Sequence, residues 1–248
     1  MKANRSRRIG PERRRGSCLM VFARAPVMGQ VKSRLAARMG DKAALELYRA
    51  FVTDLLRTLD QTGYPIQIHF APPEAAGMMG EWLGPEYPLI PQNSGDLGRK
   101  MAAAFHLAFS ARYEKSVLIG TDFPDLPADI IHEAFTALDR RPAVIGPSHD
   151  GGYFLIGFKR EGFLPAAFQG IAWGTADVLD QTARIFEQNQ VLLHYVSSWW
   201  DIDTYADLLD LSGRLGPAAV QTAPETRKIL AAHNLLKARN LKGKPEKQ

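Results

Sequence analysis

The stretch SCLMVFARAPVMGQVKSRL, residues 17–35, places a short apolar segment directly before a basic loop. The apolar part, Ser17–Ala23, is continuous rather than alternating, which is typical of a strand buried on both faces of a sheet. The loop that follows contains Pro26 and Gly29 and leads into a helix. In an open α/β sheet ligands collect beyond the carboxyl ends of the strands, so the loops after predicted strands are the places to search for a site.

The rest of the chain alternates between predicted strands and predicted helices. Short apolar segments predict further strands at Ile66–Ala71, Ser116–Gly120, Ala143–Gly146, Tyr153–Phe158 and Val191–Val196. Helical periodicity and capping residues predict helices from Asp41 to Gly63, at Leu97–Phe109 with Asp96 as N-cap, and at Pro127–Leu138, Ala176–Glu187, Thr204–Leu215 and Pro224–Ala238. This alternation favours an α/β fold with three layers, in which helices cover both faces of a mostly parallel sheet.

The net charge of +5 is concentrated at the two ends of the chain. Residues 1–16 carry seven Lys or Arg and one Glu, and residues 237–248 carry five and one, which leaves residues 17–236 at about −5. Tails of this composition bury too little apolar surface to fold. We therefore expect a single folded domain at 17–236 between two disordered basic tails, at 1–16 and 237–248. The acidic body argues against nucleic-acid binding.

The cysteine and hydropathy patterns indicate a cytoplasmic protein without a membrane span. Cys18 is the only cysteine, so an internal disulfide is excluded and a reducing compartment is expected. The longest apolar run near the start, Cys18–Ala23, is too short for a signal-peptide core or a transmembrane helix. The six histidines show no paired ligand spacing, which argues against a zinc site.

The first loop concentrates positive charge. Arg24, Lys32 and Arg34 surround a loop between a strand and a helix, where backbone N–H groups are also available. Together these groups predict a polyphosphate site. The loop is neither a Walker A motif nor a dinucleotide fingerprint, because both glycine patterns are missing. The structural alternative is a solvated basic helix face.

Two loops supply carboxylates. Asp122 directly follows a predicted strand and is the better candidate for a Mg²⁺ or Mn²⁺ ligand, whereas Asp125 is expected to cap the next helix or support the loop. Asp203, with Asp201 two residues earlier on the same side of an extended segment, precedes the helix at 204–215. Asp203 or Thr204 is expected to cap this helix, so Asp203 is either a second metal ligand facing Asp122 or simply a helix N-cap.

Two further loops are candidates for substrate binding. In the turn between two predicted strands, Gly151 and Gly152 permit close approach of a ligand, and Asp150 can orient or deprotonate an acceptor hydroxyl. The alternative is a hairpin turn in which Asp150 bonds only its own backbone. The segment containing Gly95, Asp96 and Arg99, at a predicted helix N-terminus, suits a base, a ribose or a phosphate.

Taken in order, five segments resemble one bacterial family. They are the basic loop after the first strand, GDLG at 95–98, GTDFPDL at 120–126, DGGY at 150–153 and DIDTYADL at 201–208. The series is similar to the glycosyltransferase-A-like family of arsenosugar-biosynthesis-type glycosyltransferases, over roughly Leu19 to Leu211. It is more distantly similar to phospholactate and molybdenum-cofactor guanylyltransferases. The basic loop departs from the family pattern, because Arg24 stands where the family usually has Lys.

The resemblance implies a nucleotide-diphospho-sugar transferase fold, of the GT-A type, and a role for each segment. Arg24, Lys32 and Arg34 would hold phosphates, Lys32 also acting in catalysis, and Asp122 and Asp203 would bind the metal. Gly95 and Asp96 would lie by the nucleoside, and the Asp150 turn would face the acceptor. The expected activity is Mg²⁺-dependent transfer of a sugar from a nucleoside-diphosphate sugar to a small-molecule acceptor. The alternative is transfer of a nucleotidyl group from an NTP to a phosphorylated small molecule, with release of pyrophosphate.

Overall fold

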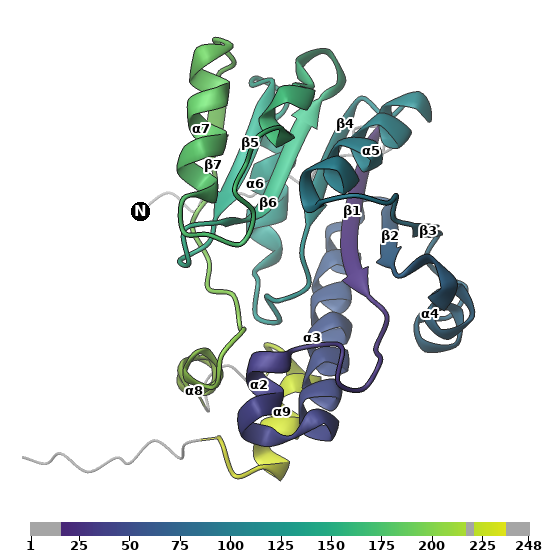
Figure 1. Cartoon of the computed structure of the whole chain (residues 1–248), viewed down its shortest axis with the longest axis vertical. Helices are drawn as coiled ribbons and strands as arrows, with labels where there is room; N and C mark the ends of the chain where they lie inside the picture. Colours follow the sequence, from purple (N-terminus) through teal and green to yellow (C-terminus); the bar gives the residue numbers. More distant parts are fainter. Residues whose placement is uncertain (1–15, 217–220, 237–248) are drawn as a thin grey trace, which may run out of the picture.

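The computed structural model describes residues 16–216 and 221–236, and its strands form one seven-stranded sheet. The sheet has the order β3-β2-β1-β4-β6-β5-β7 (Figure 1). The strands are β1 (Ser17–Arg24), β2 (Ile66–Ala71), β3 (Leu89–Pro91), β4 (Lys115–Ile119), β5 (Ala143–Pro147), β6 (Tyr153–Lys159) and β7 (Leu193–Tyr195). β6 runs antiparallel to its neighbours β4 and β5, and the other pairs are parallel. The sheet is therefore mixed but mostly parallel, as predicted.

Helices cover both faces of this sheet. Leu19 and Val21 of β1 pack in one apolar cluster with α3 (Asp41–Thr62) and α6 (Ala128–Ala137). Cys18 and Met20, which point to the opposite face, pack in a second cluster with α5 (Leu97–Ser110) and α7 (Val178–Gln188). Because successive side chains of one strand are buried on opposite sides, the fold has the three layers expected from the continuous apolar segment.

A third apolar cluster lies beyond the carboxyl ends of the parallel strands. It joins α2 (Ser33–Met39), α8 (Tyr205–Arg214) and α9 (Pro224–Ala232) to the first half of α3 (Figure 1). The buried carboxylate of Asp54, on α3, accepts the backbone N–H groups of Glu225 and Thr226 at the beginning of α9, at 3.0 and 2.7 Å. This cluster lies next to the loops that follow β1, β4 and β7.

The structure confirms most predicted elements and corrects several bounds. The bounds of β2 agree with the sequence, Gly63 ends α3 in the left-handed region (φ 69°), and Asp96 caps α5. Helix α9 ends at Ala232, earlier than predicted, because Asn234 adopts a left-handed conformation (φ 55°). α4 (Ala76–Leu83) and β3 were not predicted. The predicted tails at 1–16 and 237–248 lie outside the described residues, apart from Gly16.

His69 on β2 provides a pH-dependent test of this packing. Its side chain is buried, its Nε2 atom has no hydrogen-bond partner, and burial lowers its pKa to about 4. The unfolded chain takes up a proton near pH 6.5 and the folded chain only near 4, so the free energy of unfolding should fall as the pH drops through this window. By this linkage His69 should account for about 2 kcal/mol of the loss between pH 7 and pH 5.

Urea unfolding at pH 7 and pH 5 measures this contribution. A His69→Leu variant should lose less free energy of unfolding than the wild type over the same interval. His233→Leu, which changes an exposed histidine, should retain the wild-type pH dependence. Equal losses in the wild type and the His69→Leu variant would show that His69 titrates normally in the folded protein.

Candidate functional site

Lys32 connects the loops that follow three strands of the sheet. It lies immediately before α2 with its backbone in the left-handed region (φ 50°, ψ 45°). Its Nζ atom lies 2.5 Å from Oδ1 of Asp122, after β4, and 2.8 Å from Oδ1 of Asp203, after β7. It also donates to the carbonyl oxygen of Ile202 at 2.6 Å. A non-glycine residue in this region carries a cost of roughly 1–3 kcal/mol, which these contacts offset.

The charges of this cluster are unequally exposed. The Lys32 side chain is 4% exposed, whereas those of Asp122 and Asp203 are 37% and 38% exposed. Burial lowers the pKa of Lys32, but the two carboxylates raise it by more, and the result lies above the ordinary value for lysine. Lys32 is therefore protonated. Arg34 adds a second cation, with Nη1 3.9 Å from Oδ2 of Asp203 and most of its side chain in solvent.

Thr204, rather than Asp203, caps α8. The Thr204 hydroxyl accepts the backbone N–H of Asp207, and the Asp207 carboxylate accepts the N–H of Thr204 at 2.6 Å. This reciprocal pair is a capping box. The interpretation of Asp203 as the helix N-cap is therefore wrong, and its carboxylate is available to Lys32 and Arg34.

Asp122 and Asp203 are the side chains that could hold a divalent metal ion. Both carboxylates contact one cation, the Lys32 ammonium, and hard oxygen ligands are those that Mg²⁺ prefers. In residues 16–216 and 221–236, no group of three or more His, Cys, Asp or Glu side chains is arranged to hold a metal ion. Mg²⁺ commonly binds through one or two carboxylates, with substrate phosphates and water as its other ligands. The donor set thus fits Mg²⁺, in competition with Lys32.

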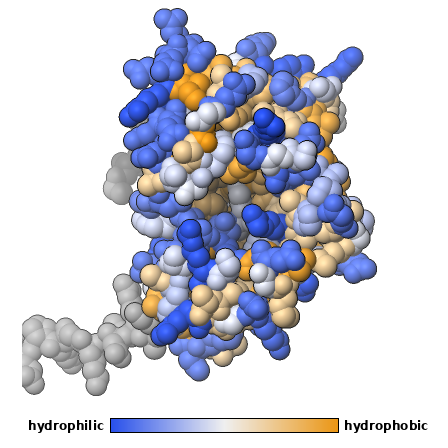
Figure 2. Space-filling model, in the orientation of Figure 1, coloured by the Kyte–Doolittle hydropathy of each residue, from blue (hydrophilic) through white to orange (hydrophobic). Residues whose placement is uncertain are grey.

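A cavity of about 830 Å³ lies on the α2 side of the cluster. Figure 2 shows this face of the molecule hollowed between the sheet and α2. Its charged lining side chains are Arg24, Lys32, Arg34, Lys100, Asp122 and Asp203. The three cations predicted to bind phosphate are thus brought together around one cavity with an excess of positive charge.

Tyr48 fixes the backbone of the basic loop. Its hydroxyl group accepts the N–H of Arg24 at 2.8 Å and donates to the carbonyl of the same residue at 2.9 Å. Tyr48 lies on α3 and also lines the larger cavity. Its role was not predicted, because a tyrosine on the apolar stripe of a helix is indistinguishable in sequence from an ordinary core residue.

A second cavity, of about 430 Å³, adjoins the first. The two share Phe22, Arg34, Leu97, Gly120, Asp122 and Asp203, so the Lys32 cluster lies at their junction. Asp150, Gly152, Tyr153 and Trp173 line the second cavity but not the first. The sequence prediction that the Asp150 turn faces a ligand is compatible with this placement.

Asp150 forms the bonds of a turn and also lines a cavity, and its action on an acceptor hydroxyl stays a prediction. Its Oδ1 atom accepts the backbone N–H of Gly152 at 2.9 Å and the hydroxyl of Ser148, as in an ordinary turn. The residue is nevertheless exposed and lines the smaller cavity. The turn bonds thus hold the carboxylate in a fixed position at the cavity wall.

Two glycines allow the segment around Trp173 to close this cavity. A Cβ atom on Gly98 would lie 2.3 Å from the carbonyl oxygen of Phe168 and 2.9 Å from the Trp173 ring. A Cβ atom on Gly151, which has φ 89°, would lie 2.1 Å from the carbonyl oxygen of Ala176. Such contacts are too short for any other residue, so these glycines permit the close packing that places Trp173 in the cavity wall.

Asp201 also lines the smaller cavity and was not predicted as a site residue. Burial, followed by the negative charges of Asp150 and Asp203, raises its pKa to about 6. Its spacing from Asp203 within an extended segment was the available signal, because residues two apart in such a segment point the same way.

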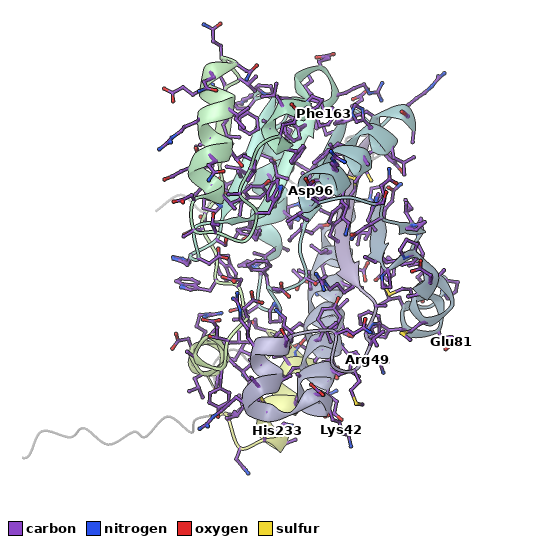
Figure 3. All side chains as sticks on the ribbon, viewed as in Figure 1. Lys42, Arg49, Glu81, Asp96, Phe163 and His233 are labelled. Atoms are coloured by element: carbon purple, nitrogen blue, oxygen red, sulfur yellow. The ribbon has the colours of Figure 1, made fainter. Side chains whose placement is uncertain are left out.

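Four other predicted site residues do not line either cavity. Among the described residues, Gly95, Asp96, Arg99 and Gly151 are absent from the lining of both. Asp96 lies at the beginning of α5 (Figure 3), where its side chain accepts the N–H of Arg99 at 2.8 Å. Their assignment to the nucleoside stays a prediction, while Gln92, Leu97 and Lys100 of the same region line the larger cavity.

Asp125 supports the loop that carries Asp201 and Asp203. Its buried carboxylate accepts the indole N–H of Trp199 at 3.1 Å and pairs with Nε of Arg214, on α8, at 2.9 Å. The Arg214 guanidinium also lies over the Trp200 ring, 5.2 Å from its centroid. Of the two roles expected for Asp125, the structure shows loop support.

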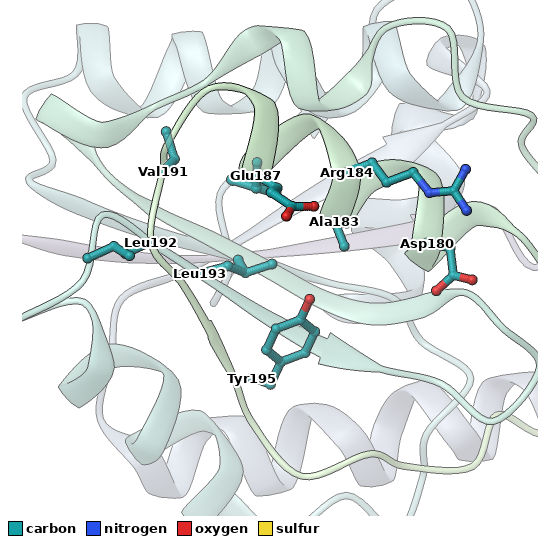
Figure 4. A pocket seen from close by; sticks show the side chains of 9 residues that line it. Asp180, Ala183, Arg184, Glu187, Val191, Leu192, Leu193 and Tyr195 are labelled. Atoms are coloured by element: carbon teal, nitrogen blue, oxygen red, sulfur yellow. The ribbon is translucent and has the colours of Figure 1, made fainter.

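A third cavity lies at the far edge of the sheet. It has a volume of about 490 Å³, is lined by residues of α7 and of the segment containing β7 (Figure 4), and shares no lining residue with the other two. Of its charged lining residues, Arg184 lies between Asp180 and Glu187 in sequence on α7. None of the predicted site residues is found there.

Comparison with known proteins identifies the fold and related chains. A family model described as "Uncharacterized protein conserved in bacteria (DUF2064)" matches residues 55–175. A crystal structure of a provisionally named nucleotide-diphospho-sugar transferase from Desulfovibrio desulfuricans G20 is 34% identical, with a TM-score of 0.84, over 89% of this chain and 96% of that one. A comparison with curated proteins gives no match.

More distant structures share the fold alone. The 4-diphosphocytidyl-2C-methyl-D-erythritol synthase of Anaerococcus prevotii DSM 20548 has a TM-score of 0.54 and 11% identity, over 83% of this chain and 99% of that one. The inositol-1-phosphate CTP transferase of T. maritima has a TM-score of 0.51 and 16% identity, over 85% and 96%. The three-layer fold is thus that of nucleotide-diphospho-sugar transferases and related nucleotidyltransferases. No helix among the described residues combines the length and apolar character needed to cross a membrane.

Proposed function

Since the chain belongs to the DUF2064 family of bacterial proteins and has the fold of nucleotide-diphospho-sugar transferases, we propose that it is a Mg²⁺-dependent glycosyltransferase. It transfers a sugar from a nucleoside-diphosphate sugar to a small-molecule acceptor. The observation that carries this proposal is the Lys32–Asp122–Asp203 cluster at the junction of a basic cavity and a smaller acidic one. In this proposal the donor phosphates bind on the basic side of the junction and the acceptor binds on the other side.

The basic cavity holds the donor. Arg24, Lys32 and Arg34 bind the diphosphate, whose negative charge increases as the bond to the sugar breaks. Tyr48 keeps the basic loop in place through its two bonds to Arg24. Asp122 and Asp203 would hold Mg²⁺, which when bound neutralises part of the charge on the leaving nucleoside diphosphate. Asp150, fixed at the wall of the smaller cavity, orients the attacking hydroxyl.

A thermal-shift panel tests the proposal. NTPs, nucleoside diphosphates and nucleoside-diphosphate sugars are each added with Mg²⁺, Mn²⁺ or EDTA. A ligand at a hundred times its Kd adds about 2.7 kcal/mol of stability, which gives a clear rise in melting temperature. We expect one nucleoside series to stabilise the protein only with metal, and Asp122→Ala to remove the shift. Asp129→Ala, an exposed carboxylate on α6, should leave it intact.

The released product separates the two transfer reactions. Nucleoside diphosphate released from the stabilising donor indicates glycosyl transfer, whereas pyrophosphate released from an NTP indicates the nucleotidyl alternative. Absence of a shift with every nucleotide and metal would contradict the phosphate assignment and the proposed activity with it.

A further inference from the structure

The two adjoining cavities differ in the sign of their charge. The charged side chains that line the larger cavity are four cations, Arg24, Lys32, Arg34 and Lys100, and two carboxylates, Asp122 and Asp203. Those that line the smaller cavity are four carboxylates, Asp122, Asp150, Asp201 and Asp203, and one cation, Arg34. An anionic ligand is therefore favoured in the larger cavity and opposed in the smaller one.

The negative charge of the smaller cavity is only partly compensated. Lys32 pairs with Asp122 and Asp203, and Arg34 lies 3.9 Å from Asp203 with 73% of its side chain exposed. Asp150 has a hydroxyl and a backbone N–H as partners, and neither Asp150 nor Asp201 forms an ion pair among the described residues. A phosphate group placed here would meet two carboxylates that no cation balances.

Most of the uncharged side chains that line the smaller cavity are apolar, and Ser148 and Thr175 add hydroxyl groups. Trp173 and Tyr153 contribute aromatic surface, with their ring centroids 6.3 Å apart in an edge-to-face arrangement, and Met101 lies beside them. A cavity of about 430 Å³ is near the lower end of the usual range for small-molecule sites. Apolar walls with a few fixed carboxylates suit a small compound that presents an apolar face together with hydroxyl or ammonium donors.

We propose that the acceptor is an uncharged or cationic hydroxyl compound, and that this cavity excludes phosphorylated acceptors. The inference rests on the proposed function, because it takes the larger cavity as the donor site. A hydroxyl group of the acceptor molecule donates a hydrogen bond to Asp150 or Asp201. The carbon skeleton of the acceptor packs against Trp173. The same charge distribution disfavours the nucleotidyl alternative, since that reaction needs a phosphorylated acceptor beside these carboxylates.

The first experiment measures the sign of the electrostatic potential in the smaller cavity, and it needs no acceptor. Fluorescence quenching by iodide, caesium and acrylamide is compared between the wild type and Trp173→Phe, so that the difference reports on Trp173. Each quenching constant is divided by that of the same quencher on free N-acetyltryptophanamide, and on this scale we expect caesium and acrylamide to quench the Trp173 fluorescence at least about threefold more efficiently than iodide. Iodide quenching equal to that of caesium would overturn the charge argument, whether or not the protein proves to be a transferase.

The second experiment measures acceptor use. Release of nucleoside diphosphate from the donor is followed with glycerol or glycerol 3-phosphate, with glucose or glucose 6-phosphate, and with glucosamine as a cationic member. We expect each unphosphorylated member to accelerate release at least tenfold more than its phosphate. Greater acceleration by the phosphates, or none by any compound, would overturn the proposal. Slow donor hydrolysis without an acceptor reports separately on the proposed function.

Charge-neutralising variants connect the preference to particular residues. The preference is the acceleration of nucleoside diphosphate release by an unphosphorylated acceptor divided by that of its phosphate. The double substitution Asp150→Asn and Asp201→Asn should lower this ratio at least about threefold and should raise quenching of Trp173 by iodide. Asp210→Asn, an exposed carboxylate on α8 that lines neither cavity, should change neither quantity. An unaltered preference in the double variant would show that these carboxylates do not set it.

Discussion

Replacing Lys32 by methionine should lower kcat/KM for the nucleoside-diphosphate sugar by about 10²–10³-fold. This is the range found when a single fixed donor to a developing negative charge is removed. Lys32 is protonated and its side chain is 4% exposed. Because this position is buried, a cation from solution does not take the place of the missing ammonium group in the variant. If Lys32 acts on the charge that develops on the leaving diphosphate, the loss should appear mainly in kcat. If Lys32 instead bound the donor equally in the ground state and the transition state, its removal would raise KM alone.

Metal binding provides a second measurement on the same variant. In the wild type the Lys32 ammonium contacts both carboxylates, so Mg²⁺ alone should cause little stabilisation. In Lys32→Met the two carboxylates lose their common partner, and Mg²⁺ or Mn²⁺ alone should raise the melting temperature. A variant that loses activity without gaining this metal response would indicate that Lys32 acts on phosphate only.

Lys42→Met is the matched control for both measurements. Lys42 is an exposed lysine at the beginning of α3 (Figure 3) and lines neither cavity. Its substitution should leave kcat/KM and the metal response within about twofold of the wild type. Activity within tenfold of the wild type in Lys32→Met would contradict the role proposed for Lys32.

The sheet and its first helices were predictable because local signals agree with the packing. Ser17–Arg24 has no polar alternation because both faces of β1 are covered, and Gly63 ends α3 in a conformation that glycine adopts at little cost. α4 was missed because Gly77 and Gly80 interrupt its pattern, and β3 because three residues ending in Pro91 carry no alternation. β3 depends on its pairing with β2, and α4 depends on its packing against β3, rather than on their own sequences.

The candidate site was predictable in its charges but less so in its shape. Lys32, Asp122 and Asp203 follow different strands, and the topology brings their side chains together. Asp96 and Asp203 looked alike in sequence, since both precede helices, yet Asp96 caps its helix and Asp203 does not. The difference arises because Thr204 and Asp207 form a capping box, so the Asp203 carboxylate does not cap the helix. This choice between neighbouring caps is local, because the bonds that decide it join Thr204 to Asp207 within the first turn of the helix.

Replacing Asp125 by alanine should lower the free energy of unfolding by about 3 kcal/mol. Asp125 is buried and joins the loop after β4 to Trp199 and to Arg214 of α8. Breaking a buried ion pair by removing one partner costs roughly 3–5 kcal/mol, because the other charge is left without compensation. The lower end applies, since the Arg214 side chain is 26% exposed. Urea unfolding of the variant at pH 7 measures the loss.

Two comparisons isolate the ion pair from the loss of packing. Asp129→Ala, an exposed carboxylate in the first turn of α6, should cost only about 0.3–1 kcal/mol through the helix dipole. A double-mutant cycle with Arg214→Ala should give a coupling energy of about 1–3 kcal/mol between the two side chains. A coupling near zero would show that Asp125 stabilises the loop through Trp199 alone. The loop that contains Trp199 also carries Asp201 and Asp203, which line the smaller cavity. Asp125→Ala should therefore also raise the KM of the proposed transfer reaction, because loss of this support changes the geometry of both cavities.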